Sequence, residues 1–222
     1  MQPKAIIFDL DGTLLDTLRD LTLSTNAALA AFSLPPRTEE EVRAFVGNGV
    51  EKLMERAVPA GRANPSFAPC LDYFRTHYKV HCLDHTAPYP GVPEVLERLQ
   101  KASIRTAIVS NKFDAAVKEL AAHYFGSLID LAVGESAAVR KKPAPDAVLA
   151  VMRALSVSPA ECVYVGDSDV DVETGRNAGV RTIGVLWGFR DEACLRRAGG
   201  TELAHAPHDL LPLLSLSGDA AE

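Results

Sequence analysis

The chain alternates short apolar runs with longer segments whose apolar residues recur at helical spacing. The apolar runs occupy residues 5–8, 106–109, 162–165 and 182–186. Each is short and rich in β-branched residues, so we predict four buried strands, with residues 129–133 as a weaker fifth candidate. Helices are predicted for residues 93–99, 115–122, 145–155 and 170–178. This alternation indicates an α/β fold, in which helices cover both faces of a Rossmann-like, mainly parallel sheet.

Residues 17–87 interrupt this alternation. No strong strand occurs there, and the pattern favours several helices broken by Leu34-Pro35-Pro36, Gly47-Asn48-Gly49 and Pro59. We therefore predict that residues 17–87 form a helical insertion, and that residues 1–16 and 88–222 together form the α/β core. Residues 215–222 are predicted to be a flexible tail.

Charge and cysteine content argue against several classes of protein. The formal net charge is -6, whereas surfaces that bind nucleic acid or anionic membranes cluster lysine and arginine. Four cysteines without a CxxC pair favour reduced thiols over a zinc site or a disulfide framework. Asp9 interrupts the first apolar run before a signal peptide could develop, and no later run reaches transmembrane length. We expect a cytoplasmic protein, and the sequence does not indicate its oligomeric state.

The residues that follow the predicted strands carry the candidate chemistry. In a parallel sheet the carboxyl ends of the strands share one edge, where ligands bind. Turn formation or helix capping explains any one of these polar residues, but not the whole set in one chain. The set comprises Asp9, Asp11, Ser110, Asn111, Lys142, Asp167 and Asp171.

Carboxylates crowded at one edge repel each other unless a cation lies among them. Mg²⁺ suits such oxygen ligands and is usually held by a few carboxylates together with a substrate phosphate. No histidine or cysteine stands at this edge to favour zinc. Lys142, Ser110 and the backbone amides near Gly12 and Asn111 are available for the phosphoryl oxygens. The set indicates phosphoryl transfer from a small phosphorylated metabolite.

Four motifs of the chain resemble those of the haloacid dehalogenase (HAD) superfamily. They are Asp9-Leu10-Asp11-Gly12-Thr13, Ser110-Asn111, Lys142-Pro143 and Gly166-Asp167-Ser168-Asp169-Val170-Asp171, in the family's order. The resemblance implies the HAD fold, with residues 17–87 as its helical cap. It also implies a phosphatase, because the dehalogenases of the superfamily lack the second carboxylate of the first motif.

The resemblance further implies roles for the motif residues. Asp9 would be the nucleophile that forms an aspartyl-phosphate, and Asp11 the general acid and base. Magnesium would be held by the Asp9 carboxylate, the Asp11 backbone carbonyl and Asp167, with Asp171 in direct or supporting contact. The implied phosphate contacts are Thr13, Ser110, Asn111 and Lys142.

A closer resemblance is to bacterial phosphoglycolate phosphatases, through residues 42–49, 110–112, 141–145 and 187–190. It implies hydrolysis of 2-phosphoglycolate to glycolate and phosphate. Arg43 would pair with the substrate carboxylate, although an ordinary turn beside a solvated arginine explains the same residues equally well. The implied specificity residues of the cap are Arg43, Gly47, Asn48 and Gly49.

Other interpretations stay open. The same chemistry could act on a sugar phosphate, a nucleotide or pyrophosphate, or could return the phosphoryl group to its substrate as in a phosphomutase. A non-catalytic phospho-acceptor interaction module is also conceivable, because receiver domains combine an aspartate, magnesium and a lysine at a sheet edge. His77, His81 and His85 recur every four residues, but a polar helix face explains them better than a zinc site without a fourth ligand.

Overall fold

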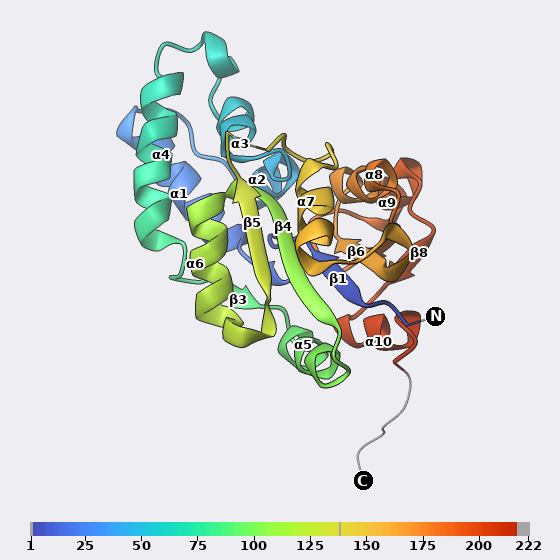
Figure 1. Cartoon of the computed structure of the whole chain (residues 1–222). Helices are drawn as coiled ribbons and strands as arrows, with labels where there is room; N and C mark the ends of the chain where they lie inside the picture. Colours follow the sequence, from blue (N-terminus) through green and yellow to red (C-terminus); the bar gives the residue numbers. More distant parts are fainter. Residues whose placement is uncertain (1, 138, 217–222) are drawn as a thin grey trace.

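A computed structural model of the chain describes residues 2–137 and 139–216 (Figure 1). Its main sheet has six parallel strands in the order β5-β4-β1-β6-β7-β8. All five predicted strands are present, whereas β8, which has no apolar run, is not apparent from the sequence. The six strands are β1 (Ala5–Phe8), β4 (Arg105–Phe113), β5 (Leu131–Glu135), β6 (Cys162–Gly166), β7 (Arg181–Val185) and β8 (Glu202–Ala204).

Helices cover both faces of this sheet, as predicted. The side chains of β1 alternate between the faces, so that Phe8 packs with α5 and α6, whereas Ile7 packs with α7 and the end of α8. Each face therefore has its own apolar core. The four helices are α5 (Val92–Lys101), α6 (Asp114–Tyr124), α7 (Asp146–Leu155) and α8 (Asp169–Ala178).

Residues 17–87, here called the helical segment, gather on one side of the sheet (Figure 1). They have an apolar core of their own, which includes Leu29, Met54 and Phe74. The helical segment therefore packs around apolar side chains separate from those of the sheet. Its helices are α1 (Leu18–Ala31), α2 (Glu39–Phe45), α3 (Val50–Ala57), the 3-10 turn η1 (Gly61–Ala63) and α4 (Phe67–His81).

The two connections to the helical segment pair with each other. They form the antiparallel strands β2 (Leu15–Asp16) and β3 (Ala87–Pro88), in which Leu15 pairs with Pro88 and Asp16 with Ala87. The chain therefore leaves and re-enters the α/β core at one place. This small ladder is not apparent from the sequence, because two-residue strands leave no periodicity to detect.

The remaining elements are short. None of the described helices is long and apolar enough to cross a membrane.

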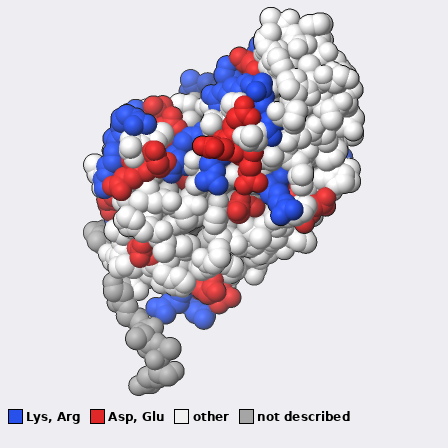
Figure 2. All heavy atoms as spheres, turned by 180° about the vertical axis from the view of Figure 1, so that it is seen from behind, with Lys and Arg blue, Asp and Glu red and all other residues white. Residues whose placement is uncertain are grey.

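Figure 2 shows acidic and basic side chains interspersed over much of the face that it displays, whereas the helical segment, at the upper right, is mostly uncharged there. Residues 217–222 of the predicted tail lie outside the described residues. The short elements are η2 (Gly126–Leu128), η3 (Pro159–Glu161), α9 (Glu192–Ala198), η4 (Pro207–Asp209) and α10 (Leu210–Leu213).

Candidate active site

Three buried carboxylates, from Asp9, Asp167 and Asp171, lie together, with one oxygen of each within 4.8 Å of the others. Their proximity follows from the pairing of β1 with β6. Phe8 pairs with Val165, and the Asp9 backbone N–H donates to the Val165 carbonyl over 2.9 Å. Both parallel strands therefore end at the same edge of the sheet and deliver the carboxylates that follow them.

Lys142 lies between two of these carboxylates. Its Nζ is 2.9 Å from Asp9 Oδ1 and 2.7 Å from Asp171 Oδ1, and it donates to the Tyr164 hydroxyl over 3.0 Å. The side chain of Lys142 is only 3% exposed, so the ion pairs are shielded from solvent. Tyr164 was not identified from the sequence, although a tyrosine in a buried strand is a signal, because its hydroxyl needs a partner.

Both oxygens of Asp171 accept hydrogen bonds. Oδ1 accepts from Lys142 Nζ and, over 3.1 Å, from the Tyr164 hydroxyl. Oδ2 accepts from the backbone N–H of Ser168 over 3.1 Å and from its hydroxyl over 2.6 Å, in the capping box that begins α8. Asp171 thus holds both the lysine and the start of the helix in place.

Asp167 is held by the loop after β7 and by the first motif. Its Oδ2 accepts from the Phe189 N–H over 2.7 Å, and its Oδ1 from the Thr13 hydroxyl over 3.4 Å. Thr13 is fully buried, so its side chain supports Asp167 in this arrangement. Gly12 has φ +82°, and a Cβ there would lie 2.4 Å from Asp167 Oδ2. Only glycine tolerates both that backbone and that contact.

Asp11 is bound from two directions. Its Oδ1 accepts from the Thr17 hydroxyl over 2.7 Å and from Lys112 Nζ over 2.8 Å. Lys112 also donates to the Tyr78 hydroxyl over 2.7 Å. Neither Lys112 nor Tyr78 was identified as a site residue from the sequence. Lys112 could have been identified from its position, because it directly follows the Ser110-Asn111 motif.

The charges of this site do not balance. When all groups are ionised, four carboxylates face two ammonium groups, which leaves a formal charge of -2. Burial raises the pKa of Asp9 to about 7; Lys142 opposes this rise, and Asp171 and Asp11 add to it. Burial, with Asp171 and Asp9 adding, likewise raises the pKa of Asp167 well above its usual value. A divalent cation among these oxygen ligands would remove the imbalance, so the residues fit a metal ion.

A pocket lies between this site and the helical segment. Its free volume is about 40 Å³. The core contributes Asp9, Asp11, Ser110, Asn111, Lys112, Asp167, Ser168, Phe189 and Arg190, and the helical segment contributes Leu21, Val46, Gly47, Gly49, Val50 and Leu53. Asn111 connects the two sides, because its Nδ2 donates to the Gly47 carbonyl over 3.0 Å.

The proposed specificity residues fall into two groups. Gly47 and Gly49 line the pocket, and both have positive φ. Asn48 instead accepts a 2.9 Å hydrogen bond from Arg56, and Arg43 is exposed and is not among the lining residues. Arg190 belongs to the segment 187–190 that carries the closer resemblance, but it was not expected as a site residue. It lines the pocket and donates to the Arg43 carbonyl over 2.8 Å and the Val46 carbonyl over 2.5 Å.

The three histidines at four-residue spacing have separate partners. His77 contacts the Ser24 hydroxyl at 3.0 Å, and His81 contacts Asp84 at 2.7 Å. Helix α4 ends at His81, so His85 lies beyond it and contacts Asp20 at 2.9 Å. Among the described residues, the cluster able to hold a metal is the aspartate site and not these histidines.

Comparison with known proteins agrees with this geometry. Residues 6–185 match the model of the haloacid dehalogenase-like hydrolase family. A phosphoglycolate phosphatase from Aquifex aeolicus is 34% identical, over 84% of this chain and 86% of the relative. An N-acetylmuramic acid 6-phosphate phosphatase from Pseudomonas aeruginosa is 32% identical, over 96% of both chains.

The fold has close counterparts among solved structures. The crystal structure of a candidate phosphoglycolate phosphatase from Lactobacillus delbrueckii superposes with a TM-score of 0.92 and 33% identity, over 96% of this chain and 99% of that one. The prediction of a phosphatase is confirmed by these relatives, and the interpretation as a non-catalytic phospho-acceptor module finds no support among them. The chain belongs to the haloacid dehalogenase-like hydrolase family.

Proposed function

We propose that this phosphatase is magnesium-dependent, works through an aspartyl-phosphate on Asp9, and acts on a small carboxylated ester of the 2-phosphoglycolate type. The observation that carries the proposal is that Asp9, Asp11 and Asp167 line one pocket, while Lys142 Nζ lies 2.9 Å from Asp9 Oδ1. The group that attacks phosphorus, the group that moves the proton and the groups that neutralise charge then share one small space.

The metal would be held by oxygen ligands alone. The ion would be held by Asp9, Asp167 and the Asp11 backbone carbonyl. When bound, it would neutralise negative charge on the transferring phosphoryl group. Asp171 would support it indirectly, because its oxygens already accept from Lys142, Tyr164 and Ser168.

The reaction would proceed in two displacements. An oxygen of the Asp9 carboxylate attacks phosphorus, the ester P–O bond breaks, and protonated Asp11 gives its proton to the leaving alkoxide. Asp11, now a carboxylate, takes a proton from water as that water attacks the phosphorus of the aspartyl-phosphate. The bond between phosphorus and Asp9 breaks, which releases phosphate and restores both aspartates. Lys142 and Ser110 would bind the transferring oxygens.

The pocket favours a small substrate. The helical segment presents apolar side chains to it, from Leu21, Val46, Val50 and Leu53. The hydroxyls of a sugar phosphate would lose hydrogen bonds with water against such a wall. A single carboxylate needs one cation, and Arg190 lines the pocket whereas Arg43 does not. We therefore propose Arg190 as the partner of that carboxylate. A sugar phosphate is the second candidate substrate, because one relative is an N-acetylmuramic acid 6-phosphate phosphatase.

The proposal is tested by phosphate release from 2-phosphoglycolate, a hexose 6-phosphate, a nucleoside monophosphate and pyrophosphate, with and without magnesium. We expect magnesium-dependent release, fastest from 2-phosphoglycolate, and a loss of about 1,000-fold or more in Asp9→Asn. Asp72→Asn is the matched control, because this exposed carboxylate of α4 pairs with Arg75 and does not line the pocket. Unchanged turnover in Asp9→Asn would overturn the proposal.

Substrate recognition is tested with two esters of similar size, 2-phosphoglycolate and the neutral-tailed 2-hydroxyethyl phosphate. Arg190→Met should raise KM for the carboxylated ester about 10-fold more than for the neutral one. Arg43→Met should change neither by more than about 2-fold, since an exposed arginine outside the pocket contributes little. The reverse pattern would assign the carboxylate to Arg43.

A further inference from the structure

Lys112 joins the proposed general acid to the helical segment. It stands in β4, directly after Asn111, and its side chain is 4% exposed. Its Nζ donates to Asp11 Oδ1 over 2.8 Å and to the Tyr78 hydroxyl over 2.7 Å, and it lies 4.6 Å from the centre of the Tyr78 ring. Tyr78 belongs to α4, so one buried ammonium group bridges the α/β core and the helical segment.

The two donors to Asp11 both reach Oδ1. Thr17 donates to this oxygen over 2.7 Å and Lys112 over 2.8 Å. Two hydrogen bonds to one oxygen restrict the rotation of the carboxylate and leave Oδ2 to exchange the proton with the substrate. A general acid works only when it lies within hydrogen-bond reach of the leaving oxygen, so this orientation matters for catalysis.

Both donors depend on where the helical segment lies. Thr17 is the N-cap residue of α1, and Lys112 is held on its far side by Tyr78 of α4. The Tyr78 ring is itself fixed by stacking on Phe74, with centroids 5.5 Å apart. If α1 and α4 moved away from the core, Asp11 would lose Thr17, and Lys112 would lose both its hydrogen bond and its contact with the ring.

We propose that Tyr78, acting through Lys112, is a positioning residue for Asp11, so that the general acid is aligned when the helical segment is docked on the core. The inference rests on the proposed function, because it assigns Asp11 the proton transfer of that mechanism. The Tyr78 hydroxyl touches no reacting atom in this arrangement. Its effect passes through the lysine to the carboxylate.

The test uses the chemistry of the leaving group. An alkyl phosphate leaves as a strongly basic alkoxide and needs a proton, whereas p-nitrophenyl phosphate leaves as a weakly basic phenolate and does not. The kcat/KM of each ester reports the steps up to the transfer of phosphate to Asp9. Impaired proton donation therefore lowers kcat/KM for the alkyl ester alone, whereas a general loss of structure lowers kcat/KM for both esters.

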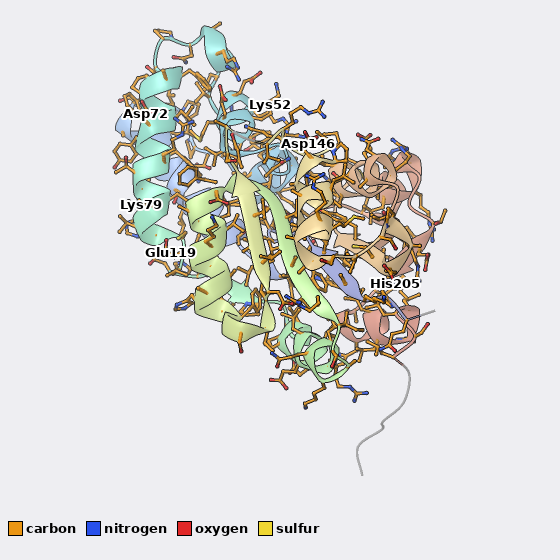
Figure 3. The ribbon with its side chains drawn as sticks, viewed as in Figure 1. Lys52, Asp72, Lys79, Glu119, Asp146 and His205 are labelled. Atoms are coloured by element: carbon orange, nitrogen blue, oxygen red, sulfur yellow. The ribbon has the colours of Figure 1, made fainter. Side chains whose placement is uncertain are left out.

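The decisive variant is Tyr78→Phe, which keeps the ring and removes the hydroxyl. We expect kcat/KM for 2-phosphoglycolate to fall about 10- to 100-fold, and that for p-nitrophenyl phosphate to change by about 2-fold or less. Asp11→Asn should show the same selectivity with a larger loss. Tyr73→Phe is the matched control, because Tyr73 lies on the same helix but is 43% exposed. Asp72 and Lys79, on the same helix, mark its outer side in Figure 3.

Equal losses for the two esters in Tyr78→Phe, or no loss for either, would overturn the inference. Lys112→Met is a second variant, and it should also lose activity on 2-phosphoglycolate but not on p-nitrophenyl phosphate. It decides the question if Tyr78→Phe does not fold. If the wild-type protein releases phosphate from no ester, the proposed function fails and the inference fails with it. If wild type is active and the variants are not selective, the inference alone fails.

Discussion

The side chain of Asn111 binds the main chain of Lys142 in both directions. Its Nδ2 donates to the Lys142 carbonyl over 3.1 Å, and its Oδ1 accepts from the Lys142 N–H over 2.8 Å. Both residues are buried, so these bonds are not exchanged for bonds with water. Lys142 is therefore held between Asp9 and Asp171 by a residue of β4, whereas Asp9 follows β1 and Asp171 follows β6.

This clamp predicts a loss of activity without loss of the fold in Asn111→Ala. Phosphate release should fall about 10- to 100-fold, the usual cost of removing a residue that orients a ligand or a charged group in a site. The matched control is Asn177→Ala, because exposed Asn177 donates to the neighbouring carbonyl of Pro143 over 2.8 Å. It should keep activity within about 2-fold. Equal activity in the two variants would contradict a role for the clamp.

Without metal, the protein should lose stability as pH rises from about 4 to about 7. Burial raises the pKa of Asp9 to about 7 in the folded state, whereas an unfolded chain has an aspartate pKa near 4. Between these values the folded state binds more protons than the unfolded state, so its stability falls as the pH rises. The pKa of Asp167 is raised as well, by burial and by Asp171 and Asp9, so it adds to the same loss of stability.

Denaturant unfolding at pH 5 and pH 7.5, in chelator and in magnesium, measures this effect. Magnesium should restore stability at pH 7.5 and change little at pH 5, because it binds the ionised carboxylates. Asp167→Asn should be more stable than wild type in chelator at pH 7.5 and should respond weakly to magnesium. A metal-free wild type that is equally stable at both pH values, with no gain from magnesium, would argue against the site.

Gly12→Ala should disable the site. The backbone has φ +82°, and the new Cβ would lie 2.4 Å from Asp167 Oδ2, so the side chain proposed to bind the metal must move. We expect at least 100-fold less activity and weaker stabilisation by magnesium. Gly179→Ala is the matched control, because φ is +70° but no atom lies within 4 Å of its Cβ. It should cost about 1 kcal/mol of stability and leave activity unchanged.

Asp20→Ala should loosen the return connection from the helical segment. Asp20 is 1% exposed and accepts hydrogen bonds from the backbone N–H and side chains of His85 and Thr86, at 2.8–3.0 Å. Removing it leaves buried donors unpaired, at a cost of about 2–4 kcal/mol. Asp72→Ala, an exposed site on α4, should cost less than about 0.5 kcal/mol. Chemical denaturation compares the two variants.

The contacts of Asp20 also predict how the stability changes with pH and how fast hydrogen exchange is at the return connection. Burial would raise the pKa of Asp20, but the bonds from His85 and Thr86 outweigh it and lower the pKa. Its stabilisation is therefore complete above about pH 4 and is lost as pH falls through the folded-state pKa. In Asp20→Ala, hydrogen exchange at His85 and Thr86 should speed up at neutral pH. Unchanged exchange there would show that other contacts hold the connection.

The strands and the edge at which the carboxylates meet could be predicted from the sequence. A buried strand is recognised from its own residues, and parallel pairing of neighbouring strands brings their ends together wherever the rest of the chain goes. Asp9 and Asp167 are 158 positions apart in the sequence, yet their place after β1 and β6 was enough to expect them in one site. The order of the motifs then indicated the family.

The contacts across the pocket were decided by tertiary structure. Arg43 was expected to face the substrate, but the structure places Arg190 at the pocket, with Arg43 offering its carbonyl to it. Lys112 meets Tyr78, 34 residues earlier in the chain. Such contacts depend on how the helical segment docks on the core, and short-range periodicity carries no information about that orientation. The sequence by itself determined five strands of the sheet, the family and the chemical groups at the sheet edge. Only the docking of two separately packed cores decided which side chains complete the site.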